Sequence, residues 1–194
     1  MRPSSLFKKF CKMVRVVGID AGYVNLAVCG IDTEEPDKPY FWHNFCLFNG
    51  PFSEEKLVSS IYHWIHLPEI KHLLDSADCI VLERQMTMKF QAVNHCIRFA
   101  YFHKTKEVSP MSVGAFFGLP RERRPKKKAA VDLVSQFVVL PVKKGKKDDY
   151  ADAFLLAMYE LGGRGDFASK YQRAAVSAPP KKKARPVVVD VDDF

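Results

Sequence analysis

The chain has 194 residues, of which 47% are hydrophobic, and this size and composition suit one domain with a sizeable core. No apolar run reaches roughly 18 residues, which excludes a membrane-spanning helix. The formal net charge is +8, and the lysines and arginines lie in clusters, as in proteins that bind polyanions. A basic surface without a specific role explains the charge alone equally well.

The first half of the chain predicts three strands, an interrupted helix and a buried strand. Residues 1–13 form a basic arm without acidic residues. The strands that follow have short connections, which predict an antiparallel meander, and they are expected at 14–20, 25–31 and 40–47. Ser53 is placed to cap a helix that Pro68 interrupts and restarts. The apolar run CIVLE at 79–83 is typical of a buried strand.

The next segment predicts a helix over 86–102 that is apolar nearly all round. Such a helix is either deeply buried or packs on the core and on a partner together, which makes it our candidate dimer element. A short strand is expected at 107–111, with a turn at Pro110.

The last part of the domain combines basic runs with two helices. The run RERRPKKK at 121–128 leads into a predicted helix at 129–137. A final helix starts at Asp148 and ends at Gly162-Gly163. The whole pattern predicts an α/β fold over 14–165, with a mixed central sheet flanked by helices: the three-strand antiparallel meander plus parallel strands.

Four acidic residues in three stretches are the candidate metal ligands. Asp20 and Glu83 each end an apolar strand, where a carboxylate is costly unless something compensates it. Asp149 and Asp152 are three residues apart and therefore share one face of the final helix. Carboxylates that converge without matching cations favour Mg²⁺, a hard cation that takes oxygen ligands. This pattern predicts metal-dependent phosphoryl transfer, in which two ions about 3.5–4 Å apart promote an in-line displacement.

Each of these acidic groups also has a purely structural interpretation. Asp20 is compatible with a turn before Gly22, and Glu83 is compatible with a plain ion pair to Arg84. The acidic residues Asp148, Asp149 and Asp152 suit a helix cap that complements the helix dipole. The occurrence of all three groups at the ends of regular elements favours a functional site.

Three motifs around these acidic residues resemble those of the RuvC-type Holliday junction resolvases, closest to the branch of fungal mitochondria and large DNA viruses. GIDAGYVNLAV resembles the first-strand motif, in which a catalytic Asp is followed by Gly and a strand with Asn-Leu-Ala. IVLERQ resembles the second motif, and KKDDYADAFLLA resembles the third, the Asp-x-x-Asp helix. Their order and spacing fit over residues 14–162.

The resemblance implies a ribonuclease H-like fold, a homodimer, and Mg²⁺-dependent symmetric nicking of four-way DNA junctions, with Mn²⁺ as an expected substitute. The catalytic and metal-binding residues that it implies are Asp20, Glu83, Asp149 and Asp152. Gln85 matches a family position beside the metal site. Asp148 is an extra neighbour that the motif does not assign, and an exchange with Asp149 stays open.

The basic segments are expected to bind DNA phosphates, which give affinity and salt dependence rather than sequence preference. One group precedes the catalytic helix and is expected to flank the scissile phosphate: Lys143, Lys144, Lys146 and Lys147. A second group is expected to follow another arm of the junction: Arg121, Arg123, Arg124, Lys126, Lys127 and Lys128. Phe116, Phe117 and Tyr150 are candidates for base stacking, although core packing is the preferred interpretation.

Three alternatives to a junction resolvase stay open. The first is a related nuclease that acts on flaps, branched DNA or RNA–DNA hybrids, and the second is a noncatalytic DNA-binding protein. The third is an actin-like phosphotransferase, for which the chain is short.

The C-terminal segment 166–194 is rich in proline and segregated charge, which predicts a disordered tail with an acidic end. Its run PPKKKARP is typical of a nuclear localisation signal, with a solvated tail of nonspecific phosphate affinity as the alternative. We therefore expect a virus-encoded protein of the host nucleus or cytoplasm. Because residues 1–13 also suit a short transit peptide, a mitochondrial protein is the alternative.

Overall fold

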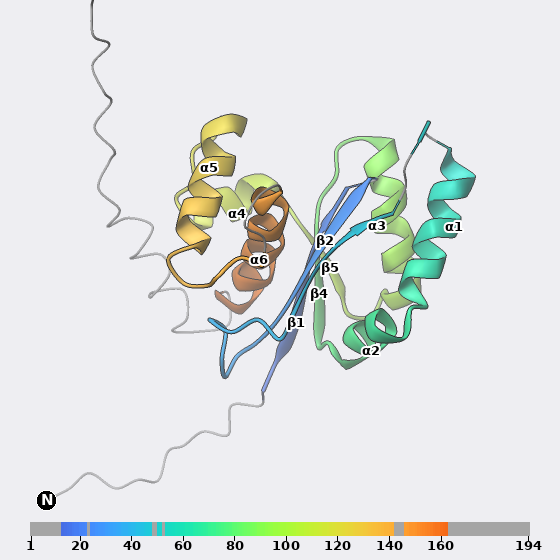
Figure 1. Ribbon diagram of the computed structural model, residues 1–194, viewed down its shortest axis with the longest axis horizontal. Helices are drawn as coiled ribbons and strands as arrows, with labels where there is room; N and C mark the ends of the chain where they lie inside the picture. Colours follow the sequence, from blue (N-terminus) through green and yellow to red (C-terminus); the bar gives the residue numbers. More distant parts are fainter. Residues whose placement is uncertain (1–12, 23, 48–49, 52, 142–145, 163–194) are drawn as a thin grey trace, which may run out of the picture.

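The computed structural model describes residues 13–22, 24–47, 50–51, 53–141 and 146–162. In this part of the chain a five-stranded sheet lies between two groups of helices (Figure 1). Its strands are β1 (Arg15–Ala21), β2 (Asn25–Asp32), β3 (Phe41–Cys46), β4 (Cys79–Glu83) and β5 (Thr105–Val108). They lie in the order β3-β2-β1-β4-β5. The first three strands pair antiparallel, whereas β4 pairs parallel with β1, and β5 with β4.

Alternation of side chains along the strands builds a separate hydrophobic core on each face of the sheet. On β1, Val16 belongs to one core, whereas Val17 and Ile19 belong to the other. On β4, Val81 lies on the same face as Val16, and Leu82 lies on the opposite face. Because successive residues point to opposite faces, counting along either strand from these residues tells on which face its last side chain lies.

One face of the sheet is covered by α1 (Glu54–Ile65), α2 (Pro68–Ser76) and α3 (Met88–Tyr101) (Figure 1). Ser53 caps α1 by accepting a hydrogen bond from the Lys56 amide at 3.4 Å. Pro68 occupies the first position of α2, where its missing N–H group is tolerated. Both features agree with the prediction from sequence.

The other face is covered by α4 (Pro110–Phe116), α5 (Arg123–Val134) and α6 (Lys147–Gly162) (Figure 1). Helix α6 packs on β1 and β2 and also against α5. Gly18 permits this close packing, because a Cβ there would lie 2.1 Å from the Ala153 carbonyl oxygen and 3.1 Å from the Ala157 Cβ. The small residues of β1 and α6 thus bring the helix backbone down onto the strand that carries Asp20.

The predicted mixed α/β sheet is confirmed, and two local predictions are wrong. The expected strand at 107–111 is β5, which ends at Val108, and Pro110 begins α4 instead of forming a turn. A proline is well suited to a first helical turn, and Ser109 caps this helix. The helix expected from residue 129 begins at Arg123, so most of the basic run lies within α5.

Several predictions concern residues outside the described part of the chain. These are the arm at 1–12, Lys143 and Lys144, and the tail from residue 166 with its PPKKKARP run. The localisation that they suggested stays a prediction. Within the described residues, no helix combines the length and apolarity required to cross a membrane.

Candidate metal-dependent nuclease site

Strand register brings Asp20 and Glu83 to the same edge of the sheet. Strands β1 and β4 run parallel with Ile19 opposite Leu82, so the next residues along the two strands are Asp20 and Glu83. Because side chains alternate along a strand, Asp20 lies on the same face of the sheet as Val16, and Glu83 lies on the same face as Val81. Both carboxylates therefore lie at the carboxyl ends of neighbouring strands, on the face that α6 covers.

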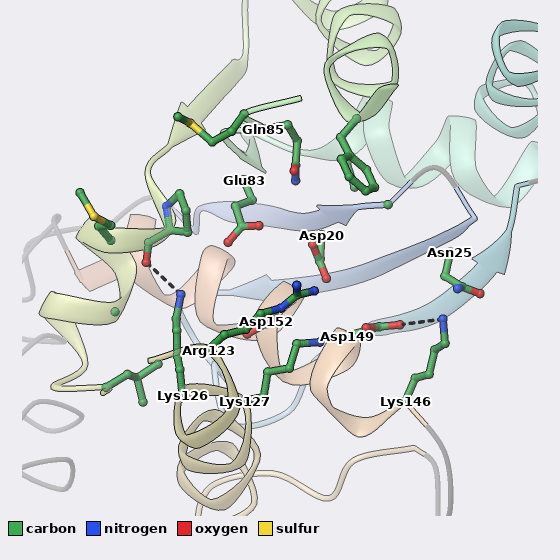
Figure 2. Close-up of a pocket in the computed structure, with 18 of the residues that line it drawn as sticks. Asp20, Asn25, Glu83, Gln85, Arg123, Lys126, Lys127, Lys146, Asp149 and Asp152 are labelled. Carbon is green, nitrogen blue, oxygen red and sulfur yellow. Dashed lines mark hydrogen bonds and ion pairs between the residues drawn. The ribbon is translucent and has the colours of Figure 1, made fainter. Parts of the chain in front are cut away.

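Helix α6 adds Asp149 and Asp152 to this edge from its first two turns. Asp20, Glu83, Asp149 and Asp152 line a single cavity of about 1210 Å³ (Figure 2). The structure thus brings together, from β1, β4 and α6, the four acidic residues that the sequence singled out.

Burial and mutual repulsion disfavour the ionised form of these carboxylates. Burial raises the pKa of Asp20 well above its ordinary value, and the charges of Glu83, Asp152 and Asp149 raise it further. Burial likewise raises the pKa of Glu83, against the effect of Lys126, Lys127 and a hydrogen bond from Gln85. For Asp152, burial followed by the charge of Glu83 raises the pKa to about 7.

Lys127 of α5 is one of the cations beside this acidic cluster, with Lys126 and Lys146. Its ammonium group forms an ion pair with Asp148. Burial works to lower the pKa of Lys127, but Asp148, Asp152 and Asp149 together hold it above its ordinary value. Burial would raise the pKa of Asp148, but the bond from Lys127 overcomes this and keeps the pKa below the usual value. Lys127 therefore stays protonated beside the cluster.

The neighbours Asp148 and Asp149 have different surroundings, which bears on the assignment that the sequence left open. Asp149 lines the cavity, accepts a hydrogen bond from the Asn44 side chain at 3.4 Å, and lies 3.7 Å from the Lys146 ammonium. Asp148 is paired with Lys127 and is absent from the residues that line the cavity. The geometry favours Asp149 as the ligand.

The carboxylate set fits a hard divalent cation. Three of its members have raised pKa values because their charges are buried together, and Lys126 and Lys127 compensate this only in part. A divalent cation would stabilise the ionised forms, and oxygen donors are the ligands that Mg²⁺ prefers.

The basic residues predicted to bind DNA fall into three groups. Five of them line the cavity: Arg121, which precedes α5, and Arg123, Lys126, Lys127 and Lys146. Figure 2 shows the last four, which come from the start of α5 and from the residue before α6. Lys126 also donates a hydrogen bond to the Pro110 carbonyl oxygen at 3.1 Å. Arg124, Lys128 and Lys147 do not line the cavity, and Lys143 and Lys144 lie outside the described residues.

The structure also adds residues to the site that the sequence did not reveal. Asn44 of β3 reaches Asp149, and the exposed Met111 lines the cavity. Asn44 became a neighbour only because β3 lies on the edge over which α6 packs, and no motif marks it. Phe117, by contrast, is buried in the core, so the preferred interpretation of this aromatic residue is confirmed.

Solved structures with the same architecture include several resolvases. The fowlpox virus Holliday junction resolvase has a TM-score of 0.56 and 15% identity, and the match covers 78% of this chain and 100% of that chain. RuvC of Thermus thermophilus in complex with Holliday junction substrate has a TM-score of 0.54 and 15% identity, with 78% and 97% covered. The yeast mitochondrial Holliday junction resolvase Ydc2 has a TM-score of 0.53 and 18% identity, with 84% and 81% covered.

The fold is that of the RuvC-type resolvases. The ribonuclease H-like fold expected from the three motifs is thereby confirmed. No family model matches the chain, and no curated protein matches its sequence. The resemblance therefore rests on the tertiary structure and on the short motifs around the acidic residues.

Proposed function

We propose that this chain is a Mg²⁺-dependent DNA endonuclease that resolves four-way (Holliday) junctions by paired symmetric nicks. The observation that carries the proposal is the cavity in which Asp20, Glu83, Asp149 and Asp152 converge beside several basic side chains. The fold adds support, because the similar T. thermophilus and fowlpox proteins were solved with Holliday junction DNA.

The four carboxylates would hold Mg²⁺ or, as a substitute, Mn²⁺. When bound, such ions supply Lewis-acid stabilisation of the phosphate and a more acidic water. The protein side chains have complementary roles. Gln85 lines the cavity beside Glu83 and works to lower the pKa of this carboxylate, which favours its ionised form. Lys127 and Arg123 face the same cavity and bind the phosphate backbone, so that the scissile phosphate is held against the carboxylates (Figure 2).

The remaining basic residues extend the proposed DNA path. Lys146, just before α6, and Arg121, just before α5, both line the cavity and extend this path. Lys147 begins α6, Arg124 and Lys128 lie on α5, and none of the three lines the cavity. We assign these three residues to more distant phosphates, where each contributes mainly to salt-dependent affinity. Lys143 and Lys144 lie outside the described residues, and their place beside the scissile phosphate stays a prediction.

A homodimer is part of the proposal, because paired nicks require two active sites. The outer surface of α3 is the proposed interface: the side chain of Phe99 is 90% exposed, and that of Phe102, directly after the helix, is 77% exposed. Large apolar groups at this exposure are typical of a protein–protein contact. Sedimentation at micromolar concentration is expected to show a dimer, and Phe99→Asp is expected to give a monomer.

Cleavage of an immobile four-way junction is the direct test. Wild-type protein with Mg²⁺ is expected to give paired nicks at symmetric positions, whereas Asp20→Asn gives none. The proposal fails if the wild-type protein makes no nicks or if Asp20→Asn keeps full activity. A parallel panel of flap, RNA–DNA hybrid and duplex substrates separates junction resolution from a related nuclease activity. Salt-sensitive binding without turnover would instead indicate a noncatalytic DNA-binding protein.

A further inference from the structure

Helix α3 contacts the backbone around Glu83 through two amide side chains. Asn94 Nδ2 donates a hydrogen bond to the Glu83 carbonyl oxygen at 2.8 Å. One turn earlier, Gln91 Nε2 donates a hydrogen bond to the Gln85 carbonyl oxygen at 3.2 Å. Because the two side chains are three residues apart, they lie on the same face of the helix. Together they attach the end of β4 and the residues that follow it to α3.

These bonds act at the end of β4, where its pairing with β1 has ended and β5 still pairs with Glu83. The pairing of β4 with β1 ends at Leu82, and the last residue of β4 is Glu83. Beyond it, the Arg84 amide still donates to the Val108 carbonyl oxygen of β5 at 2.7 Å. Asn94 and Gln91 thus supply backbone hydrogen bonds on the side of α3, at the two residues whose side chains meet at the site.

The orientation of Asn94 is determined by its partners. Besides the Glu83 carbonyl, its Nδ2 donates to Glu107 Oε1 at 3.0 Å. Both partners are acceptors, so the amide nitrogen must face them. The side chain is 1% exposed, and its Oδ1 has no hydrogen-bond partner among the residues that the structure describes. A buried acceptor without a partner is destabilising, so this asparagine has a cost that its two donated hydrogen bonds must offset.

We infer that Asn94 and Gln91 are positioning residues, which hold the Glu83 carboxylate and the Gln85 amide in the geometry required for metal binding. This inference rests on the proposed function. Glu83 and Gln85 both line the cavity, so the two α3 amides fix the backbone of two residues that face the site. Groups that orient metal ligands in this way contribute strongly to metal affinity.

Mn²⁺ binding to the DNA-free protein, measured by electron paramagnetic resonance, tests the inference without relying on cleavage. Asn94→Leu removes both hydrogen bonds at nearly constant volume and adds no charge, and it is expected to weaken Mn²⁺ binding about 10-fold. Gln91→Leu removes one neutral bond, and an increase in Kd of about fivefold is expected. His95→Leu is the matched control, because His95 is an exposed residue of the same helix, and its Kd is expected to equal that of the wild type.

Cleavage and stability measurements distinguish positioning from a general structural role. Asn94→Leu is expected to raise the Mg²⁺ concentration required for half-maximal cleavage, and excess Mg²⁺ should restore the rate. The affinity of this variant for the junction in EDTA should stay within about twofold of the wild type, because the phosphate-binding lysines are unchanged. Glu107→Gln keeps an acceptor for Asn94 and should bind Mn²⁺ as the wild type does.

The outcomes separate this inference from the proposed function. Wild-type affinity for Mn²⁺ in both Asn94→Leu and Gln91→Leu would overturn the positioning role alone. So would an affinity that falls only in proportion to the unfolded fraction seen by circular dichroism. If Asn94→Leu does not fold, Gln91→Leu decides the question. A wild-type protein that neither binds Mn²⁺ nor cleaves junctions would overturn the proposed function itself.

Discussion

The two faces of the sheet differ in the number of charged side chains that they bury. The core under α1, α2 and α3 is built from residues such as Leu57, Ile61 and Leu74, which are fully buried. The face under α4, α5 and α6 has a similar apolar core, but at the carboxyl ends of β1 and β4 it accumulates Asp20, Glu83 and two acidic residues of α6. One face therefore consists of apolar packing, and the edge of the other keeps buried carboxylates whose charges Lys126 and Lys127 compensate only in part.

This difference shows how the fold separates stability from chemistry. Buried carboxylates that raise one another's pKa are destabilising in the absence of a cation, which is typical of functional sites. The α1–α3 face contributes hydrophobic burial without this conflict. Its helix α3 contributes to the site through Phe90, which lines the cavity, and through the amides of Asn94 and Gln91, which reach the backbone around Glu83.

The strongest test of the comparison is Asp20→Asn, which removes one charge at nearly constant shape. Junction cleavage is expected to fall by at least about 10³-fold, because a proposed metal ligand is lost. In EDTA the same variant is expected to be at least as stable as the wild type, since a repelled buried charge has been removed. Single-turnover cleavage and thermal unfolding measure the two effects. A variant that loses stability together with activity would contradict this interpretation of the site.

The adjacent acids Asp148 and Asp149 test which of these two carboxylates belongs to the charged edge of the sheet. Asp149→Asn is expected to reduce cleavage by about 10²-fold or more, because Asp149 lines the cavity. Asp148→Asn should keep most of the rate and instead release Lys127, to which Asp148 is paired. Comparing the two rates at saturating Mg²⁺ tests the assignment, and equal losses would contradict it.

A substitution on the opposite face is expected to act on stability alone. Ile61→Ala deletes a fully buried side chain and should lower the free energy of unfolding by about 2–5 kcal/mol. At a temperature where the variant is folded, the Mg²⁺ dependence of its cleavage should match that of the wild type. Urea unfolding and a Mg²⁺ titration measure the two properties, and an altered Mg²⁺ requirement would show that the two faces are more closely coupled than we infer.

The smallest expected effect is the pH dependence of the metal-free protein. The pKa of Asp152 is about 7 in the folded chain, above its ordinary value of 3.8, so the folded state binds more protons between these pH values. Stability therefore falls as the pH rises from about 5 to 8, and Asp20 and Glu83 act in the same direction. The pKa of Asp148 is lowered, so this residue affects stability only at lower pH. Lys126 and Lys127 work to lower the pKa of Asp152 but do not cancel the effect of burial.

Calorimetry in EDTA at constant ionic strength measures this dependence. Asp152→Asn is expected to reduce the decline and to be more stable than the wild type at pH 8. A wild-type Tm that rises steadily from pH 5 to 8 would contradict the raised pKa values. Adding Mg²⁺ should also reverse the trend, because metal binding favours the deprotonated carboxylates.

Local sequence features predicted much of this protein. The β-branched runs predicted β1 and β4, Ser53 and Pro68 predicted the boundaries of α1 and α2, and the spacing of Asp149 and Asp152 placed both on one helix face. Local signals failed at Pro110 and at Arg123, because a proline permits either a turn or a helix start, and a run of like charges obscured the first turns of α5.

The sequence alone singled out the candidate site residues, because carboxylates at the ends of apolar strands are conspicuous in one dimension. Only the tertiary structure decided which of them meet. The parallel register of β1 and β4 aligns Asp20 with Glu83, and the contact between Gly18 and Ala153 lets α6 come down on that edge. The partners of Asp148, Asp149 and Asn94 depend on contacts between distant elements, since a side chain's hydrogen bonds are set by what folds against it.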